Sequence, residues 1–334
     1  MAPRFCVPAT RRILAADGGT AVRAVVTGAT GLIGRELTRQ LLVRGDDVIP
    51  VSRNGGSLPA GPRVQAVDLE RASMPRELLA GVDTLYHLAG VAHQQAREAR
   101  YQRLNVDATV TLAREALSAG VRTFVFVSSV KAMGPARDER PRDESDLSHC
   151  VDAYGASKRA AEAALCELLD GGPMRLVIIR PALVYGGPLR GNLRWMRLAA
   201  RLGLPRPPER GGRSMIGLAD LVDLLCRLPR EPWSDDAASS PLIVTDGECY
   251  SSQRIYDSMR IAGGRSPRRG RGSLVFWWLA ALGLDVLLRQ RPGTHFRKLF
   301  GWERYTSRRL LALGDWRPRE TLESTVGGET GAPR

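Results

Sequence analysis

Short apolar runs alternate with longer stretches of helical spacing through the first half of the chain. The apolar runs predict β-strands over residues 24–27, 47–52, 63–68, 84–89, 123–128 and 176–179. The longer stretches predict helices over residues 36–44, 105–119 and 154–169. Because strands and helices take turns, the pattern predicts an α/β fold, a Rossmann-type doubly wound parallel sheet with helices on both faces.

The alternation fades after Pro181, where the chain becomes richer in proline, glycine and arginine. We therefore expect a smaller, loop-rich C-terminal region beside the sheet domain. The expected boundaries are a flexible extension over residues 1–21, the sheet domain over 22–185, the smaller region over 186–322 and a flexible tail over 323–334.

The charge balance is strongly basic, with a formal net charge of +14 over 334 residues. Lysine occurs only at positions 131, 158 and 298, so arginine supplies nearly all of the positive charge. A basic balance can indicate nucleic-acid binding. Such an arginine bias, however, is typical of coding composition rather than of a groove built for phosphate. We therefore expect no nucleic-acid partner.

Five cysteines and four histidines are scattered without the spacing of a zinc site or a disulfide framework. The sequence therefore predicts no metal site and a reduced, cytoplasmic setting. The most apolar stretch, residues 274–288, is shorter than the roughly 20 residues that span a bilayer, and it contains Asp285. We expect a helix packed on the domain, while Trp277 and Trp278 leave a peripheral contact with a membrane surface open.

Three glycines follow the first predicted strand at the spacing Gly28-x-x-Gly31-x-x-Gly34. Glycines at this spacing let the backbone turn tightly and approach a pyrophosphate that rests on a helix N-terminus. The turn therefore predicts a dinucleotide site, and a tight strand–helix turn without a ligand is the alternative. The other candidate cofactor-binding residues of the turn are Thr30, Leu32 and Ile33.

The second predicted strand ends at Ser52, Arg53 and Asn54, without the carboxylate that commonly binds the ribose 2′-hydroxyl of NAD. A cation in this place favours the 2′-phosphate of NADP. We therefore predict NADP(H) as the favoured cofactor and NAD(H) as the second choice. The alternative is that Arg53 is one more arginine in an arginine-rich chain. Asp68 and Leu69, just past the third strand, are predicted to meet the adenine edge.

Tyr154 and Lys158 lie four residues apart in a predicted helix, and Ser129 ends an apolar run. Residues at this spacing share one helix face. A free tyrosine titrates near about 10, and a nearby ammonium favours the phenolate. We therefore expect Lys158 to lower the pKa of Tyr154 and Ser129 to hydrogen-bond to the phenol oxygen. Such a proton-transfer device beside a dinucleotide site serves hydride chemistry.

Together these motifs resemble the extended short-chain dehydrogenase/reductase family, in its nucleotide-sugar epimerase/dehydratase branch, over about residues 22–320. The motifs are Thr27-Gly-Ala-Thr-Gly-Leu-Ile-Gly34, His87-Leu-Ala-Gly90, Asn105-Val106, Ser128-Ser129, Tyr154-Gly-Ala-Ser-Lys158 and Arg180-Pro-Ala-Leu-Val-Tyr-Gly186. The resemblance implies that residues 22–185 bind NAD(P) and that residues 186–322 mainly bind substrate. It also implies that Ser129, Tyr154 and Lys158 are catalytic.

Further contacts are implied by the same resemblance. Those to the cofactor are Leu88, Ala89, Gly90, Asn105, Ser128, Tyr154, Lys158 and Pro181. Asn192 and Arg213 are implied as contacts of a nucleotide diphosphate, for which an arginine fork is well suited. For Arg213 a surface position is the alternative. By analogy with the family, we expect a homodimer.

Val130 and Lys131 stand where dehydratases of this branch carry an Asp-Glu pair. Without that acid and base, water elimination has no proton donor or acceptor. The Ser-Ser-hydrophobic-Lys segment instead resembles bacterial reductases that act on UDP-4-keto-6-deoxy-N-acetylhexosamines in O-antigen synthesis. We therefore expect an NAD(P)-dependent C4-keto reductase for surface polysaccharide synthesis, with Lys131 contacting the UDP-sugar. A solvated loop lysine is the alternative.

Two other functions stay open. A UDP-sugar 4-epimerase similar to UDP-glucose 4-epimerase would use the same catalytic residues in both directions. A non-catalytic NADP-binding regulator would keep the fold, but such proteins typically lose the tyrosine or the lysine. Here both Tyr154 and Lys158 are present.

Overall fold

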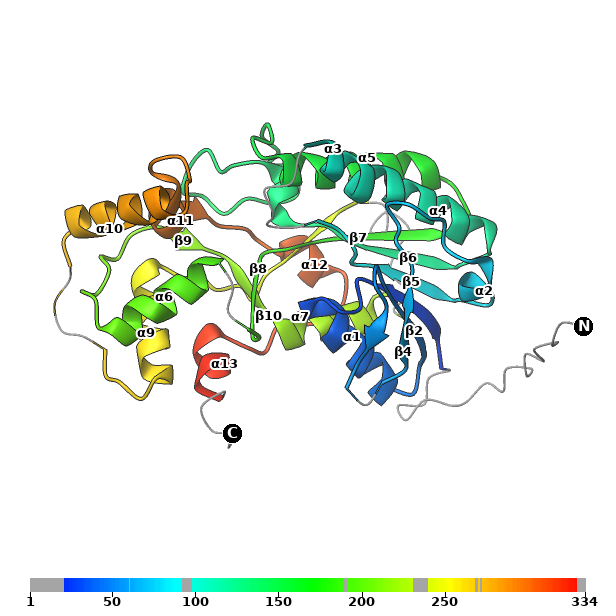
Figure 1. Cartoon of the computed structure of the whole chain (residues 1–334), viewed down its shortest axis with the longest axis horizontal. Coiled ribbons are helices and arrows are strands. Elements are labelled where there is room, and N and C mark those ends of the chain that lie inside the picture. Colours follow the sequence, from blue (N-terminus) through cyan, green and yellow to red (C-terminus); the bar gives the residue numbers. More distant parts are fainter. Residues whose placement is uncertain are drawn as a thin grey trace, which may run out of the picture.

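The computed structural model describes residues 21–59, 61–91, 98–188, 191–230, 240–267, 270 and 272–328. Its central sheet has eight strands in the order β11-β7-β6-β5-β1-β2-β4-β3 (Figure 1). Their bounds are β1 Arg23–Thr27, β2 Asp47–Ser52, β3 Gly56–Ser57, β4 Arg63–Ala66, β5 Thr84–His87, β6 Thr123–Val127, β7 Arg175–Pro181 and β11 Leu242–Val244. Neighbouring strands are parallel except β3 and β4.

Helices cover both faces of this sheet, which confirms the predicted doubly wound α/β fold. Helices α4 and α5 lie on one face, and α1 and α7 lie on the other (Figure 1). The helices that accompany the sheet are α1 Leu32–Val43, α2 Arg76–Leu79, α3 Glu98–Tyr101, α4 Ala108–Ser118, α5 Ala153–Leu169, α7 Leu218–Arg227 and α12 Arg308–Ala312. Every residue of the central strand β6 is buried, as expected of a parallel strand covered on both sides.

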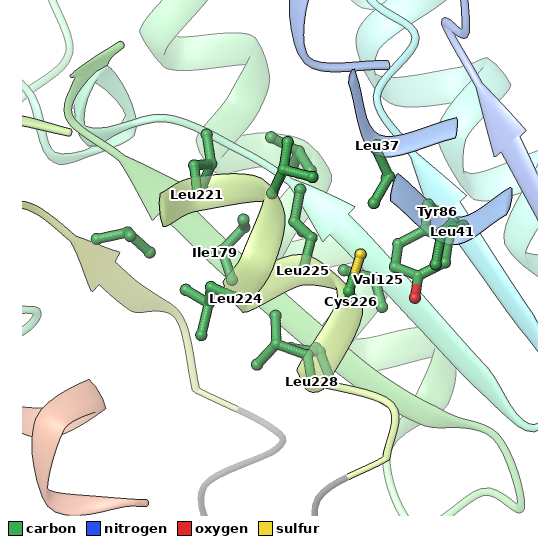
Figure 2. Close-up of a cluster of buried hydrophobic side chains, with 14 of the residues drawn as sticks. Leu37, Leu41, Tyr86, Val125, Ile179, Leu221, Leu224, Leu225, Cys226 and Leu228 are labelled. Atoms are coloured by element: carbon green, nitrogen blue, oxygen red, sulfur yellow. The ribbon is translucent and has the colours of Figure 1, made fainter. Parts of the chain in front are cut away.

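The core between the sheet and α7 is a layer of aliphatic side chains. Figure 2 shows Leu221, Leu224 and Leu225 of α7 pointing toward the sheet, where Ile179 belongs to β7. Leu37 of α1 joins the same cluster. Fully burying one such leucine stabilises the fold by about 1.5–3 kcal/mol, so this layer holds both helices against the sheet.

The smaller region lies beside the carboxyl ends of β6 and β7. Its helices are α6 Gly191–Leu202, α9 Ser252–Ala262, α10 Leu274–Leu287, α11 Thr294–Phe300 and α13 Leu322–Gly328. Two short parallel strand pairs accompany it. The pair of β8 Leu183–Tyr185 with β10 Met215–Gly217 joins it to the sheet domain, and the pair of β9 Gly212–Arg213 with β12 Trp302–Glu303 lies within it. Helix α6 packs against α9, and α10 packs against α11.

The chain passes between the two regions more than once. Helix α7 packs on α1, and β11 pairs with β7, although both follow residue 185. Leu310 and Trp316, near the C-terminal end, are buried in the same core as α1 and α7. The backbone after Trp316 is held by Asp220, whose carboxylate accepts hydrogen bonds from the amides of Arg319 and Glu320 at 2.9 and 2.8 Å. The division at residue 185 stays a prediction.

Three local features differ from the sequence-based expectation. Helix α1 begins at Leu32 rather than at residue 36, because the glycine turn itself forms the helix start at Gly31. The expected helix over 105–119 is preceded by a π-helical turn, η1 Gln102–Asp107. Residues 322–328 of the C-terminal segment are helical, because Leu322 and Val326 pack into the core of the smaller region. Residues 1–20 and 329–334 lie outside the described ranges.

Candidate active site

The glycine turn lies at the carboxyl end of β1, between β2 and β5. The strand order reverses at this point of the sheet, and in open parallel sheets ligands bind in the crevice there. Gly28 has φ +70°, and a Cβ at this position would lie 2.9 Å from the Ala89 nitrogen. A Cβ at Gly34 would collide with the Gly28 carbonyl. Only glycine therefore allows this strand, turn and helix to approach so closely.

The start of helix α1 has the features of an anion site. Gly31 is its N-cap residue and provides no side-chain cap, so the first helical amides keep their donor capacity. Thr30 and Gly31 are exposed, while Leu32 and Ile33 are half-buried. The N-terminus of α1 is therefore open, and the glycines beside it have no side chain that would obstruct a ligand. These features fit the pyrophosphate of a dinucleotide.

The ends of β2 and β4 lie next to this turn. Ser52 pairs in register with Ala66, and its hydroxyl donates to the Gly55 carbonyl at 2.9 Å. Arg53 is exposed, and no hydrogen bond or ion pair to another described residue is seen for its guanidinium. Asp68 is half-buried, and its carboxylate accepts from the Glu70 amide at 3.2 Å. The structure thus brings the candidate adenosine contacts Ser52, Arg53 and Asp68 to the same edge of the sheet. Of these, Arg53 presents a cation that has no partner among the described residues.

A series of buried side-chain hydrogen bonds fixes the backbone segment after β5, which lies opposite the glycine turn. Thr27 Oγ1 lies 2.8 Å from His87 Nδ1, and His87 Nε2 lies 2.9 Å from Thr109 Oγ1. Thr27 Oγ1 also accepts from the Ala89 amide at 3.3 Å. Burial lowers the pKa of His87 to about 3, with a smaller effect from the Lys158 charge. A neutral His87 therefore fixes the segment that carries Leu88, Ala89 and Gly90.

Asn105 ties that segment to helix α5. Its Oδ1 accepts from the Val91 amide at 2.9 Å, and its Nδ2 donates to Ser157 Oγ at 2.9 Å. The Asn105 side chain is buried, so these hydrogen bonds provide its amide oxygen and nitrogen with partners inside the protein. Leu88 and Ala89 are half-buried and Gly90 is exposed. Asn105 thus positions the loop at the end of β5, whereas a direct cofactor contact stays a prediction.

The candidate catalytic hydroxyls are brought together at the end of β6. Ser129 starts a short 3₁₀ turn, η2 Val130–Met133, and its Oγ accepts from the Lys131 amide at 3.2 Å. The same hydroxyl hydrogen-bonds to the Tyr154 side chain. Tyr154 follows the α5 N-cap Asp152, whose carboxylate accepts from the Gly155 amide at 2.8 Å. The cap fixes the first turn of α5 and with it the position of the phenol.

The pKa of Tyr154 corrects the sequence-based expectation, because it is raised to about 12 rather than lowered. Burial is the main cause, and the hydrogen bond with Ser129 opposes it. Lys158, one turn along α5, is buried and donates to the Val127 carbonyl at 3.0 Å. Its ammonium also lies 4.5 Å from the centre of the Phe126 ring. Burial lowers the pKa of Lys158 to about 8.

A buried ion pair beneath these residues was missed by the sequence analysis. Glu162 accepts from Arg180 Nε at 3.0 Å and from Arg180 Nη2 at 2.6 Å, and both side chains are about 5 % exposed. Ser128 Oγ donates to the same carboxylate. Glu162 therefore connects α5 to the ends of β6 and β7, where Pro181 is buried and pairs with Val244. The spacing of Glu162, four residues after Lys158 on one helix face, was the available signal.

Two candidate substrate-binding cations, Lys131 and Arg213, lie beside the same carboxylate, that of Glu303. Glu303 was not predicted from the sequence. Lys131 Nζ donates to Glu303 Oε1, and Lys131, Arg213 and Lys298 together hold the pKa of Glu303 below its ordinary value against the effect of burial. Arg213 is buried, lies beside Glu303 in the β9–β12 pair and donates to the Lys298 carbonyl. Asn192 is the second residue of α6, and its side chain lies outside the described part of the structure.

The apolar stretch over 274–288 is the helix α10, as expected. Within the described ranges, no helix combines the length and apolar character needed to cross a bilayer.

Comparison with known proteins identifies the family. Residues 24–202 match the NAD dependent epimerase/dehydratase family. The chain is 30% identical over 249 residues to a UDP-glucose 4-epimerase of Vibrio cholerae, covering 71% of this chain and 75% of that protein. It is 29% identical over 234 residues to a dTDP-6-deoxy-L-talose 4-dehydrogenase (NAD(P)(+)) of Kitasatospora kifunensis, covering 67% and 73%.

The solved structure of MoeE5 in complex with UDP-glucose and NAD has the same fold. Its TM-score is 0.72 at 23% identity, and the match covers 92% of this chain and 97% of MoeE5. The chain therefore belongs to the NAD-dependent epimerase/dehydratase family, the branch of the extended short-chain dehydrogenases/reductases that its motifs resemble, and is an NAD(P)-dependent enzyme of that family.

Proposed function

We propose that this enzyme reduces the C4 ketone of a UDP-4-keto-6-deoxy-N-acetylhexosamine for surface polysaccharide synthesis, such as that of O-antigen. The observation that carries the proposal is the pair of residues after the candidate catalytic serine. The hydroxyl pair of Ser129 and Tyr154 is complete, yet Val130 and Lys131 stand where a dehydratase needs carboxylates. Proton delivery to a ketone is therefore available, whereas water elimination lacks its acid and base.

In this proposal Tyr154 delivers the proton to the C4 oxygen. Its raised pKa keeps the phenol protonated near neutral pH, which is the form that ketone reduction requires. Ser129 would share a hydrogen bond with the same oxygen, and Lys158 would lie one turn behind the phenol and contact the nicotinamide ribose. A bound nicotinamide cofactor supplies the hydride. Lys131, Arg213 and Asn192 would hold the UDP-sugar.

We further propose NADPH as the favoured cofactor. At the end of β2, Arg53 is exposed beside Ser52 and has no ion pair within the described part of the chain, and the carboxylate expected for NAD is missing. The relatives show that members of this family use either form, since the Kitasatospora kifunensis protein is named for NAD(P)(+) and MoeE5 was solved with NAD. A homodimer stays part of the proposal by family analogy.

The second candidate function is UDP-sugar 4-epimerisation. The observation that favours it is the 30% identity with the Vibrio cholerae UDP-glucose 4-epimerase. In that case Tyr154 would first accept the C4 hydroxyl proton as the C4 hydride leaves. The transient 4-keto sugar would then turn over and take the hydride back on its other face, and Tyr154 would return the proton to the C4 oxygen. The raised pKa of Tyr154 makes this first step harder than proton donation.

The deciding experiment uses the purified enzyme with two substrates. UDP-4-keto-6-deoxy-N-acetylglucosamine with NADPH tests the reductase, and UDP-glucose or UDP-N-acetylglucosamine without added cofactor tests the epimerase. We expect NADPH oxidation with the keto sugar and its loss in Tyr154→Phe. Epimerisation without cofactor consumption would establish the alternative instead. No turnover of any of these substrates would support the non-catalytic NADP-binding regulator.

A further inference from the structure

Helix α10 exposes an unusual amount of apolar surface. Only Trp277, Ala281 and Asp285, spaced four residues apart, are buried. Most of the other large side chains of the helix are exposed, including Leu279 at 56%, Val286 at 71% and Leu287 at 73%, while Leu274, Leu282 and Leu284 are half-buried. The exposed apolar residues, called here the α10 face, are Val275, Phe276, Trp278, Leu279, Val286, Leu287 and Leu288. Exposed patches of this kind mark interaction sites.

The buried stripe explains why the helix is nevertheless firmly attached. The Trp277 ring lies against Phe300 of α11 in an edge-on contact, with 6.4 Å between ring centres. Asp285 accepts a hydrogen bond from the His295 amide at 3.0 Å and pairs with the His295 ring. Asp285 therefore points inward and adds no charge to the outer surface. The α10 face is a rigid apolar surface on the outer end of the smaller region (Figure 1).

The surroundings of the α10 face are cationic. From Ser258 to Phe300 the only acidic residue is Asp285, which is buried. Basic residues of the same stretch are Arg260, Arg265, Arg268, Arg269, Arg271, Arg289, Arg291, Arg297 and Lys298. Of these, Arg265, Arg289, Arg291, Arg297 and Lys298 are described as exposed. Each lysine or arginine near an anionic membrane adds about 1 kcal/mol of attraction.

We propose that the α10 face docks this enzyme onto the surface of an anionic lipid bilayer. Leucines, an exposed tryptophan and phenylalanine, and flanking arginines are the composition of helices that lie in the membrane interface. The fourteen residues of α10 suit a helix that lies on the membrane. The proposal concerns where the enzyme works and is independent of which reaction it catalyses.

A second copy of the chain is the competing occupant, and the charges argue against it. A two-fold symmetric contact through the α10 face would bring each copy's arginine cluster toward the other's, and like charges repel at short range. An anionic bilayer instead complements both the apolar residues and the cations.

Docking would also place the candidate substrate site near the membrane. Helix α10 packs on α11, and the backbone carbonyl of Lys298 in α11 accepts a hydrogen bond from Arg213. Only helix α11 therefore lies between the α10 face and Arg213. An enzyme attached in this way would meet its nucleotide-sugar substrate beside the bilayer.

The test is vesicle flotation with the full-length enzyme. Vesicles of phosphatidylcholine alone and of phosphatidylcholine with phosphatidylglycerol distinguish apolar from charge-assisted binding. We expect binding to the anionic vesicles that weakens as salt rises. Leu279→Asp combined with Leu287→Asp should weaken it at least about tenfold, because two charges enter the apolar interface. Arg291→Glu combined with Arg297→Glu should remove the preference for phosphatidylglycerol.

The matched control is Val43→Asp, since Val43 is 67% exposed on α1 in the sheet domain. It should bind vesicles like the unaltered enzyme, and an unchanged Tm would show that each variant folds. A blue shift of tryptophan fluorescence on vesicle addition, absent in Trp278→Phe, would support contact through this face. Equal binding by the aspartate double variant, or no binding to anionic vesicles, would overturn the proposal. A concentration-dependent dimer abolished by the same variant would assign the face to a second copy.

Discussion

The Lys131 ammonium donates a hydrogen bond to the Glu303 carboxylate across 172 positions of the sequence. This bond joins the turn after the candidate catalytic serine to strand β12 of the smaller region. Arg213 approaches the same carboxylate from the paired strand β9. Two cations that were assigned separately to the substrate therefore share one counter-ion. A substrate phosphate or acetamido oxygen at this place would compete with Glu303 for them.

Replacing Lys131 with alanine should raise the KM for the nucleotide sugar by about tenfold or more, as expected for a lost charge-assisted hydrogen bond. The cofactor Kd should stay nearly unchanged, because the proposed contact of Lys131 is with the sugar nucleotide and not with the cofactor. Steady-state kinetics with a separate cofactor titration measures both values. Glu303→Gln is the matched variant and should leave Lys131 available to substrate. An unchanged KM in Lys131→Ala would return this lysine to the solvated surface and weaken the reductase proposal.

Tyr154→Phe should keep cofactor binding and lose turnover by about two or more orders of magnitude, because only the proton-donating hydroxyl is removed. Tyr101→Phe is a suitable control, since the two rings lie 6.4 Å apart and Tyr101 has no proposed part in proton transfer. Single-turnover rates and cofactor fluorescence measure the two effects. Near-normal activity in Tyr154→Phe would remove this residue from the mechanism.

Arg53→Ala should weaken NADPH binding by about tenfold while changing NADH binding little, because only NADPH carries the 2′-phosphate. Arg63→Ala provides a matched loss of charge, since Arg63 is exposed at the opposite end of the neighbouring strand β4. Binding constants for both cofactors would be measured by titration. Equal losses for NADPH and NADH would show that Arg53 does not contact that phosphate.

Glu162→Gln should destabilise the fold by about 3–5 kcal/mol, because it leaves the Arg180 guanidinium buried without its carboxylate. Urea unfolding compares the variant with Glu167→Gln, which changes an exposed residue of the same helix and should shift stability by less than about 0.5 kcal/mol. If both variants unfold at the same urea concentration, the buried pair of Glu162 and Arg180 does not contribute the proposed stability.

Acid should destabilise the protein through His87. Burial lowers the pKa of His87 from 6.5 to about 3, so between these values the unfolded chain binds a proton that the folded protein does not. Stability is therefore fully present above pH 6.5 and falls as the pH drops toward 3, by up to roughly 1.4 kcal/mol per pH unit. Thermal unfolding of the protein and of His87→Asn across this range measures the difference. A parallel pH profile in the variant would assign the acid sensitivity to other groups.

The sequence predicts the sheet, the glycine turn and the serine–tyrosine–lysine set because each depends on neighbouring residues. Gly28, Gly31 and Gly34 lie within one turn, and Tyr154 and Lys158 lie one helical turn apart. Spacing alone indicates such features. Glu303 and the pair of Glu162 with Arg180 were not predicted, because their partners are distant in sequence and meet only after the strands assemble.

Burial explains the error in the expected pKa of Tyr154. Helical spacing correctly predicted that Lys158 lies one turn away. It gave no information on how much solvent surrounds the phenol or on where the ammonium finds its acceptor. The structure buries the phenol and directs Lys158 to the Val127 carbonyl. Asp285 is similar, because its position in an apolar stretch did not reveal that it hydrogen-bonds to His295 inside the fold.

The return of the C-terminal segment to the first core has a consequence for biosynthesis. Ser129 and Tyr154 are synthesised well before Glu303, which pairs with Lys131, and before Leu310 and Trp316, which complete the core of α1 and α7. Domains tend to fold as they emerge, so the sheet can form while part of its apolar face waits for these side chains. The charged cluster at Glu303 is consequently completed only after β12 has been synthesised. A nascent chain stalled before β12 would hold its candidate catalytic hydroxyls without a finished candidate substrate site.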